Sequence, residues 1–144
     1  MLGTLAARFQ PQAERFAIAS ALDVDASLIV VNVVELKPYV CTMRLLGPSA
    51  ATLPDEEDLE PVRATAARAA ELGIPTQLLR VTSSRPVRAL LAIVTERGAG
   101  LLVFGPDPGR LRPRTLRRAV AQVRERAPCL VWTPPGPWAR PGCS

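Results

Sequence analysis

Arginine is the residue type whose number and spacing most clearly suggest chemistry in this chain. Between positions 110 and 126 there are seven arginines and one acidic residue, Glu125. Because a guanidinium group donates paired hydrogen bonds to phosphate and carboxylate oxygens, such a cluster can hold an anion. The side chains that would gather it are Arg110, Arg112, Arg114, Arg117 and Arg118. The other interpretation is a solvated basic helix face with its loop, and the sequence leaves both open.

The residue types that usually carry catalysis are missing or scattered. The chain has no histidine, which excludes a Ser-His-Asp triad and removes the usual general base. Cys41, Cys129 and Cys143 form no C-x-x-C pair, so we expect neither a zinc site nor a disulfide framework. The acidic run Asp55–Asp58 is interpreted as a helix start, because carboxylates favour the positive end of the helix dipole. We therefore predict no catalytic residue and no metal.

The basic balance does not by itself indicate a nucleic-acid partner. The net charge is +5 and Lys37 is the only lysine, a pattern that codon bias in a GC-rich genome also produces. Aromatic side chains for base stacking are few, with two Trp, one Tyr and three Phe, and no nucleic-acid-binding motif is present. We expect no nucleic-acid partner.

Apolar runs of strand length alternate with helical patterns along the chain. Residues 27–34, SLIVVNVV, are apolar on both faces, as a buried parallel strand requires because helices cover both sides of such a sheet. Further strands are predicted over Met1–Ala6, Thr76–Val81, Leu101–Phe104 and Cys129–Thr133. Helices are predicted over Gln12–Leu22, from Pro54 to Gly73, over Val87–Arg97 with a cap from Ser83 or Ser84, and over Thr115–Arg126.

Each predicted helix carries an apolar stripe for the core. The inward residues are Ala13, Phe16, Ala17, Ser20 and Ala21; Leu59, Val62, Ala66, Ala69 and Ala70; Val87, Leu90, Leu91 and Val94; and Leu116, Ala119, Val120 and Val123.

This alternation predicts an α/β fold: a single domain with a five-stranded, mostly parallel sheet and helices on both faces. We assign the domain to residues 1–133 and interpret 134–144, rich in Pro and Gly, as a loose tail. No run approaches the roughly 20 apolar residues that span a bilayer, and no secretory signal is evident, so we expect a soluble cytoplasmic protein. Ligands of such sheets bind beyond the carboxyl ends of the strands, here near Ala7–Gln10, Val34–Lys37, Thr82–Ser84 and Gly105–Pro113.

From Arg80 onward the sequence resembles a universal stress protein domain. The matching parts are the helix Val87–Arg97, the link Gly98–Gly100, the strand and glycine Leu101–Gly105, the loop Pro106–Pro113, the helix Thr115–Arg126 and the closing Ala127–Cys129. More loosely, Phe9–Ala17 and SLIVVNVVE resemble the family's first helix and second strand. The resemblance implies a Rossmann-like fold of the adenine nucleotide alpha hydrolase kind. It also implies a homodimer through the last strand, Cys129–Thr133, where Trp132 would suit either the interface or the core.

The family's phosphate loop is altered in this sequence. Nucleotide-binding members carry Gly-x-x-Gly, nine residues, then Gly-Ser or Gly-Thr, so that backbone amides approach the phosphates. Gly105 fits the first position, but Pro108 occupies the second, with Gly109 one residue late. Counting on from either residue, the Gly-Ser pair is expected among Arg117, Arg118, Ala119 and Val120, where there is neither a glycine nor a hydroxyl. Pro106 and Pro108 also remove two backbone donors.

The front half of the family's site is altered as well. The aspartate that follows the first strand and contacts adenosine in binding members is replaced by Arg8 or Ala7, and Phe9 takes the place of a small residue.

We therefore predict a non-enzymatic stress-response or regulatory protein, a homodimer with a degenerate ATP loop and no bound cofactor. The alternative is a member that binds an adenine nucleotide or another small phosphorylated ligand through an arginine-lined loop. Its ligand-binding residues would be Arg8, Val34, Gly105, Asp107, Gly109, Arg117 and Arg118, although Asp107 would equally serve to stabilise a turn. Domains of this family also occur appended to transporters, and a chain without a membrane segment would then be a fragment.

Overall fold

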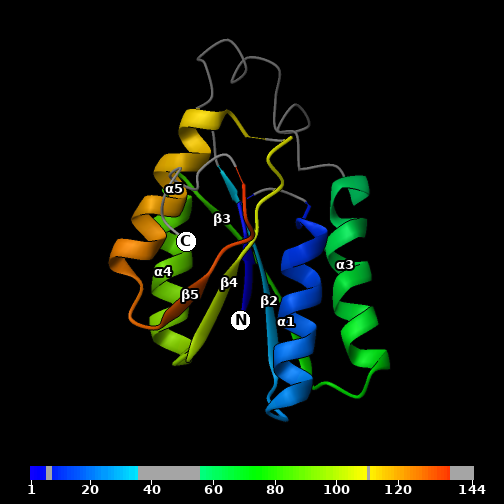
Figure 1. The fold of residues 1–144 in the computed structure, drawn as a ribbon. Coiled ribbons are helices and arrows are strands. Elements are labelled where there is room, and N and C mark those ends of the chain that lie inside the picture. Colours follow the sequence, from blue (N-terminus) through cyan, green and yellow to red (C-terminus); the bar gives the residue numbers. More distant parts are fainter. Residues whose placement is uncertain (6–7, 36–55, 110, 137–144) are drawn as a thin grey trace.

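The structure is a computed structural model that describes residues 1–5, 8–35, 56–109 and 111–136, and only the backbone of 56–59. Its centre is a five-stranded sheet in the order β3-β2-β1-β4-β5, and every pair of neighbouring strands is parallel (Figure 1). The strands are β1 (Leu2–Thr4), β2 (Leu28–Glu35), β3 (Thr76–Ser83), β4 (Leu101–Phe104) and β5 (Leu130–Trp132). The predicted α/β fold with a parallel sheet is confirmed.

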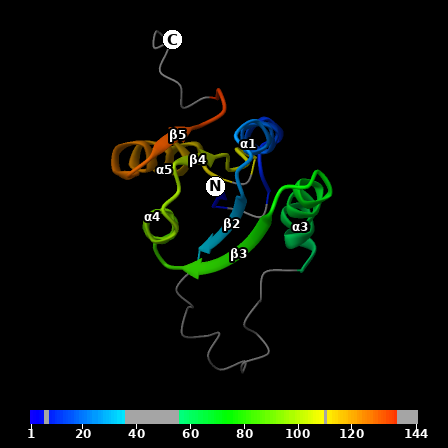
Figure 2. The same cartoon turned by 90° about the horizontal axis from the view of Figure 1, so that it is seen from below.

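Four helices cover the two faces of the sheet. They are α1 (Pro11–Asp23), α3 (Glu56–Glu71), α4 (Pro86–Arg97) and α5 (Pro113–Arg126). Figure 2 shows α1 and α3 on one face, and α4 and α5 on the other. Within the described part of the chain, no helix is long and apolar enough to cross a membrane.

Each face has its own apolar core. Under α1 and α3 the cluster includes Leu2, Ala13, Val30 and Val62, and under α4 and α5 it includes Val31, Leu90, Phe104 and Leu116. Alternate residues of β2 thus enter opposite cores, which is why the sequence of this strand is apolar almost without interruption. The predicted inward faces of α1, α4 and α5 all reach these cores or pack against them, except that Ser20 of α1 and Leu91 of α4 are only half-buried.

Some predicted boundaries and faces were wrong. β3 continues to Ser83 because Thr82 and Ser83 still pair with Val34 and Glu35. α4 begins at Pro86, and its N-cap is Arg85 in place of the predicted Ser83 or Ser84. Ser83 therefore caps only the preceding turn, where its hydroxyl oxygen accepts the Arg85 N–H at 3.0 Å.

In α3, Ala70 is exposed, while Thr65, which the apolar pattern passed over, is buried. The terminal strands are shorter than predicted, Leu2–Thr4 and Leu130–Trp132, and Pro134 is buried although it was assigned to the tail. Leu36–Pro54 and the tail beyond residue 136 lie outside the described residues.

Candidate functional site

The carboxyl edge of the sheet has one point at which the strand order reverses. β1 lies between β2 and β4, and the chain leaves β1 toward α1 on one face but leaves β4 toward α5 on the other (Figures 1 and 2). A parallel sheet binds ligands in the crevice at such a point. Arg8 lies in the first of these connections, and Gly105, Asp107 and Gly109 lie in the second.

Backbone contacts join these two connections. Phe9 and Pro106 form an antiparallel bridge, and the Gln10 N–H donates to the Gly105 carbonyl oxygen at 3.0 Å. Phe9 is only 9% exposed and packs in the apolar cluster under α1 and α3. The side chain of Arg8 is exposed, and its carbonyl oxygen accepts a hydrogen bond from the Thr4 hydroxyl at 3.1 Å. The two loops are therefore bound to each other across the reversal point.

The loop after β4 uses its amides within the fold. The Gly105 N–H donates to the Gly3 carbonyl oxygen at 3.1 Å, and the Gly109 N–H donates to Asp107 Oδ1 at 2.9 Å. Pro106 and Pro108 have no N–H to offer. A phosphate cradle depends on several backbone N–H groups that point at the ligand. Four of the five positions from 105 to 109 cannot supply one in this arrangement, and Asp107 has the turn-stabilising role.

Val34 lies one strand away from the reversal point. It is half-buried near the end of β2, where it pairs in register with Thr82 of β3. Glu35 follows it and is exposed at the strand end.

The two arginines predicted for the ligand site lie on different parts of the α5 surface. Both Arg117 and Arg118 are exposed, but only Arg118 lines the large surface cavity between α4 and α5, which has a volume of about 940 Å³. We call this cavity the α4–α5 groove; it is lined by Leu5, Glu35, Ser84, Arg85, Pro86, Val87, Arg88, Leu91, Ala92, Thr95, Thr115, Arg118, Ala119, Gln122 and Arg126. Of the seven predicted ligand residues, this groove contains Arg118 alone.

Sequence reasoning missed the other arginines of this groove. Arg85 and Arg88 come from the start of α4, and Arg126 is the last residue of α5. Residues three or four positions apart share one helix face, so the spacing of Arg85 and Arg88 already indicated a basic surface. That this surface adjoins the arginines of α5 depends on how the two helices pack. Of the exposed arginines on α5, Arg118 and Arg126 line this groove and Arg117 does not.

A second missed residue is Asn32, the one polar residue within the apolar run of β2. Its side chain is fully buried, and neither its oxygen nor its nitrogen has a hydrogen-bond partner among the described residues. It pairs in register with Thr4 on one side and Arg80 on the other. A small cavity of about 170 Å³ lies beside it under α3. A buried amide with no partner among the described residues lowers the stability of the fold.

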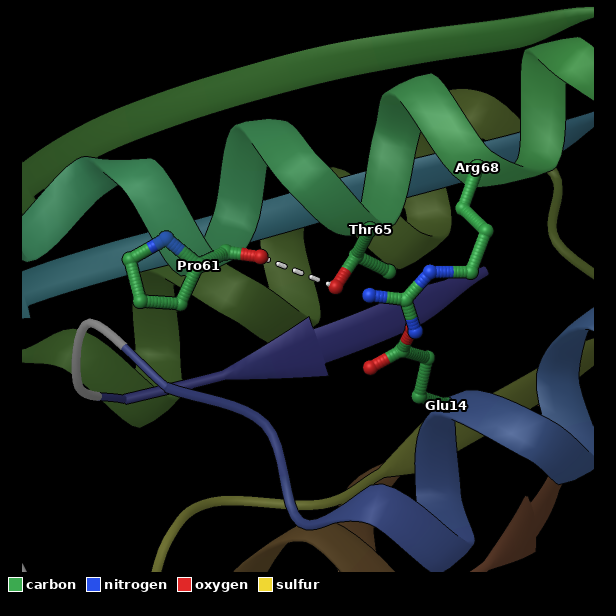
Figure 3. Close-up of polar contacts among 4 residues, drawn as sticks. All are labelled: Glu14, Pro61, Thr65 and Arg68. Atoms are coloured by element: carbon green, nitrogen blue, oxygen red, sulfur yellow. Dashed lines mark hydrogen bonds and ion pairs between the residues drawn. The ribbon is translucent and has the colours of Figure 1, made fainter.

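The polar contacts within α3 and between α3 and α1 have a structural role (Figure 3). Thr65 donates its hydroxyl hydrogen to the Pro61 carbonyl oxygen at 3.0 Å, which satisfies the hydroxyl inside the core. Arg68 of α3 forms an ion pair with Glu14 of α1 and so links the two helices. These groups lie on the face of the sheet away from the α4–α5 groove.

Cys129 immediately precedes β5, the edge strand that pairs with β4. Burial raises the pKa of its thiol, an effect that a backbone hydrogen bond from Leu102 partly offsets. A thiol with a raised pKa is a poor nucleophile at neutral pH. Elsewhere in the described residues, no three His, Cys, Asp or Glu side chains come together as a metal site would require.

Comparisons with a family model and with solved structures find the same family of proteins. Residues 8–133 match the model of the "Universal stress protein family". A protein of this family from Burkholderia pseudomallei has a similar structure, at 20% identity and a TM-score of 0.61, over 94% of this chain and 96% of that one. A universal stress protein in complex with cAMP is similar at 19% identity and a TM-score of 0.56, over 93% and 95% of the two chains. No curated protein matched the chain.

An Arabidopsis thaliana protein of the same family, with AMP bound, is similar at 14% identity and a TM-score of 0.50, over 92% of this chain and 88% of that one. At these identities the structural likeness concerns the fold.

Proposed function

Because the chain belongs to the universal stress protein family, we propose that it is a cytoplasmic, non-enzymatic stress-response or regulatory protein that acts as a homodimer without bound ATP. In this proposal the loop after β4 stabilises the fold and does not bind phosphate. The protein then acts by binding another molecule.

The observation that carries this proposal is the use of the loop's own hydrogen-bond donors. Gly105 and Gly109 donate to Gly3 and to Asp107, and the two prolines donate nothing. To hold a triphosphate with its backbone N–H groups, this loop would have to break two hydrogen bonds. One joins Gly105 to Gly3 at the end of β4, and the other joins Gly109 to Asp107 in the turn. The absence of histidine also removes the side chain that most often serves as the general base in hydrolysis.

The homodimer is supported by the exposed face of β5. β5 is an edge strand, and Leu130 at its start is 75% exposed. Trp132, the other interface candidate, stacks on Phe16 of α1 with ring centroids 4.1 Å apart, so it serves packing within the chain. Leu130 is therefore the residue that a partner strand would cover.

Two assays on the purified protein test the non-enzymatic assignment. We expect no phosphate release from ATP and Mg²⁺ above a buffer blank, and no heat when ATP is titrated into the protein at constant ionic strength. Phosphate release that scales with enzyme concentration and survives further purification would contradict the proposal.

A second candidate function is the binding of a small phosphorylated ligand through arginines. It is supported by Arg118, which shares the α4–α5 groove with Arg85, Arg88 and Arg126, and by the two similar structures that hold cAMP and AMP. Titration with AMP, cAMP and inorganic phosphate tests it. Saturable binding that is lost in Arg85→Ala with Arg118→Ala would support it, and no heat from any of the three would exclude it.

A further inference from the structure

We propose that the α4–α5 groove docks an acidic amphipathic helix of a partner protein. This inference rests on the proposed function, because it names the binding surface through which a non-enzymatic regulator would act. Four features of the groove support this inference. They are its length along two helices, its apolar lining residues, its arginines, which have no side-chain partner among the described residues, and the spacing of those arginines.

The groove runs along both helices for several turns. On α4 the lining extends from Pro86 to Thr95, and on α5 it follows Thr115, Arg118, Gln122 and Arg126 at steps of three or four residues. Ten residues of helix extend about 15 Å at the usual rise. A groove of this length, bounded by two helix ridges, accommodates a further helix of two to three turns in the manner of helix-in-groove recognition.

The lining of the groove combines apolar and basic side chains. Its apolar members are Leu5, Pro86, Val87, Leu91 and Ala92, and Ala119 of α5. Apolar side chains on one stripe of a docked helix would be removed from water here, which is the main favourable term in association.

The basic side chains of the lining come from both helices. Arg85 is the N-cap of α4 and Arg88 lies in its first turn, and Arg118 and Arg126 belong to α5. None of these four guanidinium groups forms an ion pair or a side-chain hydrogen bond with any residue that the structure describes. Among the described lining residues Glu35 is the only acidic one, and it lies at the carboxyl end of β2. The charge of the groove is therefore available to carboxylates of a partner, which would pair with both sides of the groove at once.

The spacing of the arginines favours a helix over a small anion. Arg118 and Arg126 are eight residues apart on α5, which places their Cα atoms about 12 Å apart along its axis. A single phosphate would leave the apolar part of the lining uncovered. Carboxylates on successive turns of an amphipathic helix match this spacing, while its apolar stripe covers those apolar residues.

The test uses a synthetic acidic peptide of about 12 residues, long enough for three helical turns. It carries leucines on one stripe and glutamates on both sides of that stripe, and its affinity is measured by fluorescence anisotropy at constant ionic strength. We expect saturable binding at least about tenfold tighter than that of a scrambled peptide, because scrambling separates the apolar stripe from the charges.

Charge reversal makes the result specific to the groove. In Arg88→Glu with Arg118→Glu, we expect the acidic peptide to bind at least about tenfold more weakly, and a version with lysine in place of glutamate to bind more tightly than it binds the unmodified protein. The matched control is Arg15→Glu with Arg80→Glu. It changes the net charge equally, and both arginines are exposed and lie outside the groove, so the acidic peptide should bind it within about threefold of normal.

Three results would overturn the inference. One is equal binding of the acidic and scrambled peptides, and another is equal weakening by the groove and control variants. The third is binding of AMP or inorganic phosphate in the groove when the peptide does not bind, which would establish the second candidate function instead. None of these outcomes bears on whether the protein holds ATP in its loop; a stoichiometric bound nucleotide would contradict the proposed function whatever the peptide does.

Discussion

Gly105 lies directly against Ala13 of α1: a Cβ atom added to Gly105 would come within 2.1 Å of the Ala13 Cβ. Both residues are buried, and this contact lets the end of β4 pack closely against the first helix. The glycine that fits the first position of the family's phosphate loop is therefore required by packing alone. Its presence is no argument for a nucleotide.

Gly105→Ala should destabilise the protein by about 1–3 kcal/mol, because the new methyl group forces apart two buried backbone segments. Urea unfolding followed by circular dichroism measures the change. Gly100→Ala is the matched control, since no atom lies within 4 Å of a Cβ at that position. Equal stability of the two variants would contradict the close approach.

Asn32→Leu should stabilise the protein by about 1–2 kcal/mol. The substitution replaces an amide, which is buried and unpaired among the described residues, with an apolar side chain of similar size. Asn32→Asp should be strongly destabilising at neutral pH, since it buries a charge with no described partner beside it. If Asn32→Leu lowers the denaturant midpoint, the amide has a partner that the described residues do not provide.

Leu130→Asp should convert the proposed homodimer to a monomer. The charged side chain would be buried in an interface between two β5 strands, where an unpaired carboxylate is costly. Light scattering coupled to size exclusion measures the mass. Leu78→Asp serves as the control, because Leu78 is 40% exposed on β3 at the other edge of the sheet. A dimer that survives Leu130→Asp but not Leu78→Asp would place the interface on β3 and contradict the prediction.

Cys129 should react slowly with iodoacetamide at pH 8 and accelerate only at higher pH than an ordinary thiol. Burial raises the pKa of this thiol in the folded state, so its neutral form persists where an unfolded thiol already ionises. The same shift makes its contribution to stability complete below the unfolded pKa and lost as pH rises through the folded pKa. Alkylation in a Cys41→Ser, Cys143→Ser background measures the rate, and a profile identical to that of the urea-unfolded protein would contradict the shift.

The fold was predictable from the sequence because its signals are local. The nearly continuous apolar run of β2 and the stripe Leu116, Ala119, Val120 and Val123 of α5 each indicate their element without knowledge of the rest. Errors arose where tertiary contacts decide: β3 extends by pairing with β2, and Ala70 is exposed although it continues an apolar pattern.

The candidate site was less predictable because it depends on contacts between distant segments. The prolines indicated a loop with few donors, but the sequence could not show that Gly105 donates to Gly3 or that Phe9 pairs with Pro106. The arginines were grouped by proximity along the chain. In the fold, Arg118 shares a groove with Arg85, thirty-three positions earlier in the chain, while its neighbour Arg117 does not line that groove.

The nucleotide content of the protein as purified from cells tests the central claim most directly. The protein is isolated without added nucleotide, denatured, and its supernatant analysed by ion-exchange chromatography against a member of the family known to retain ATP. A loop whose glycine amides donate to Gly3 and Asp107 should leave the protein with no more nucleotide than a buffer blank. One molecule of ATP per chain would show that the loop releases these bonds to hold phosphates, and the claim would be wrong.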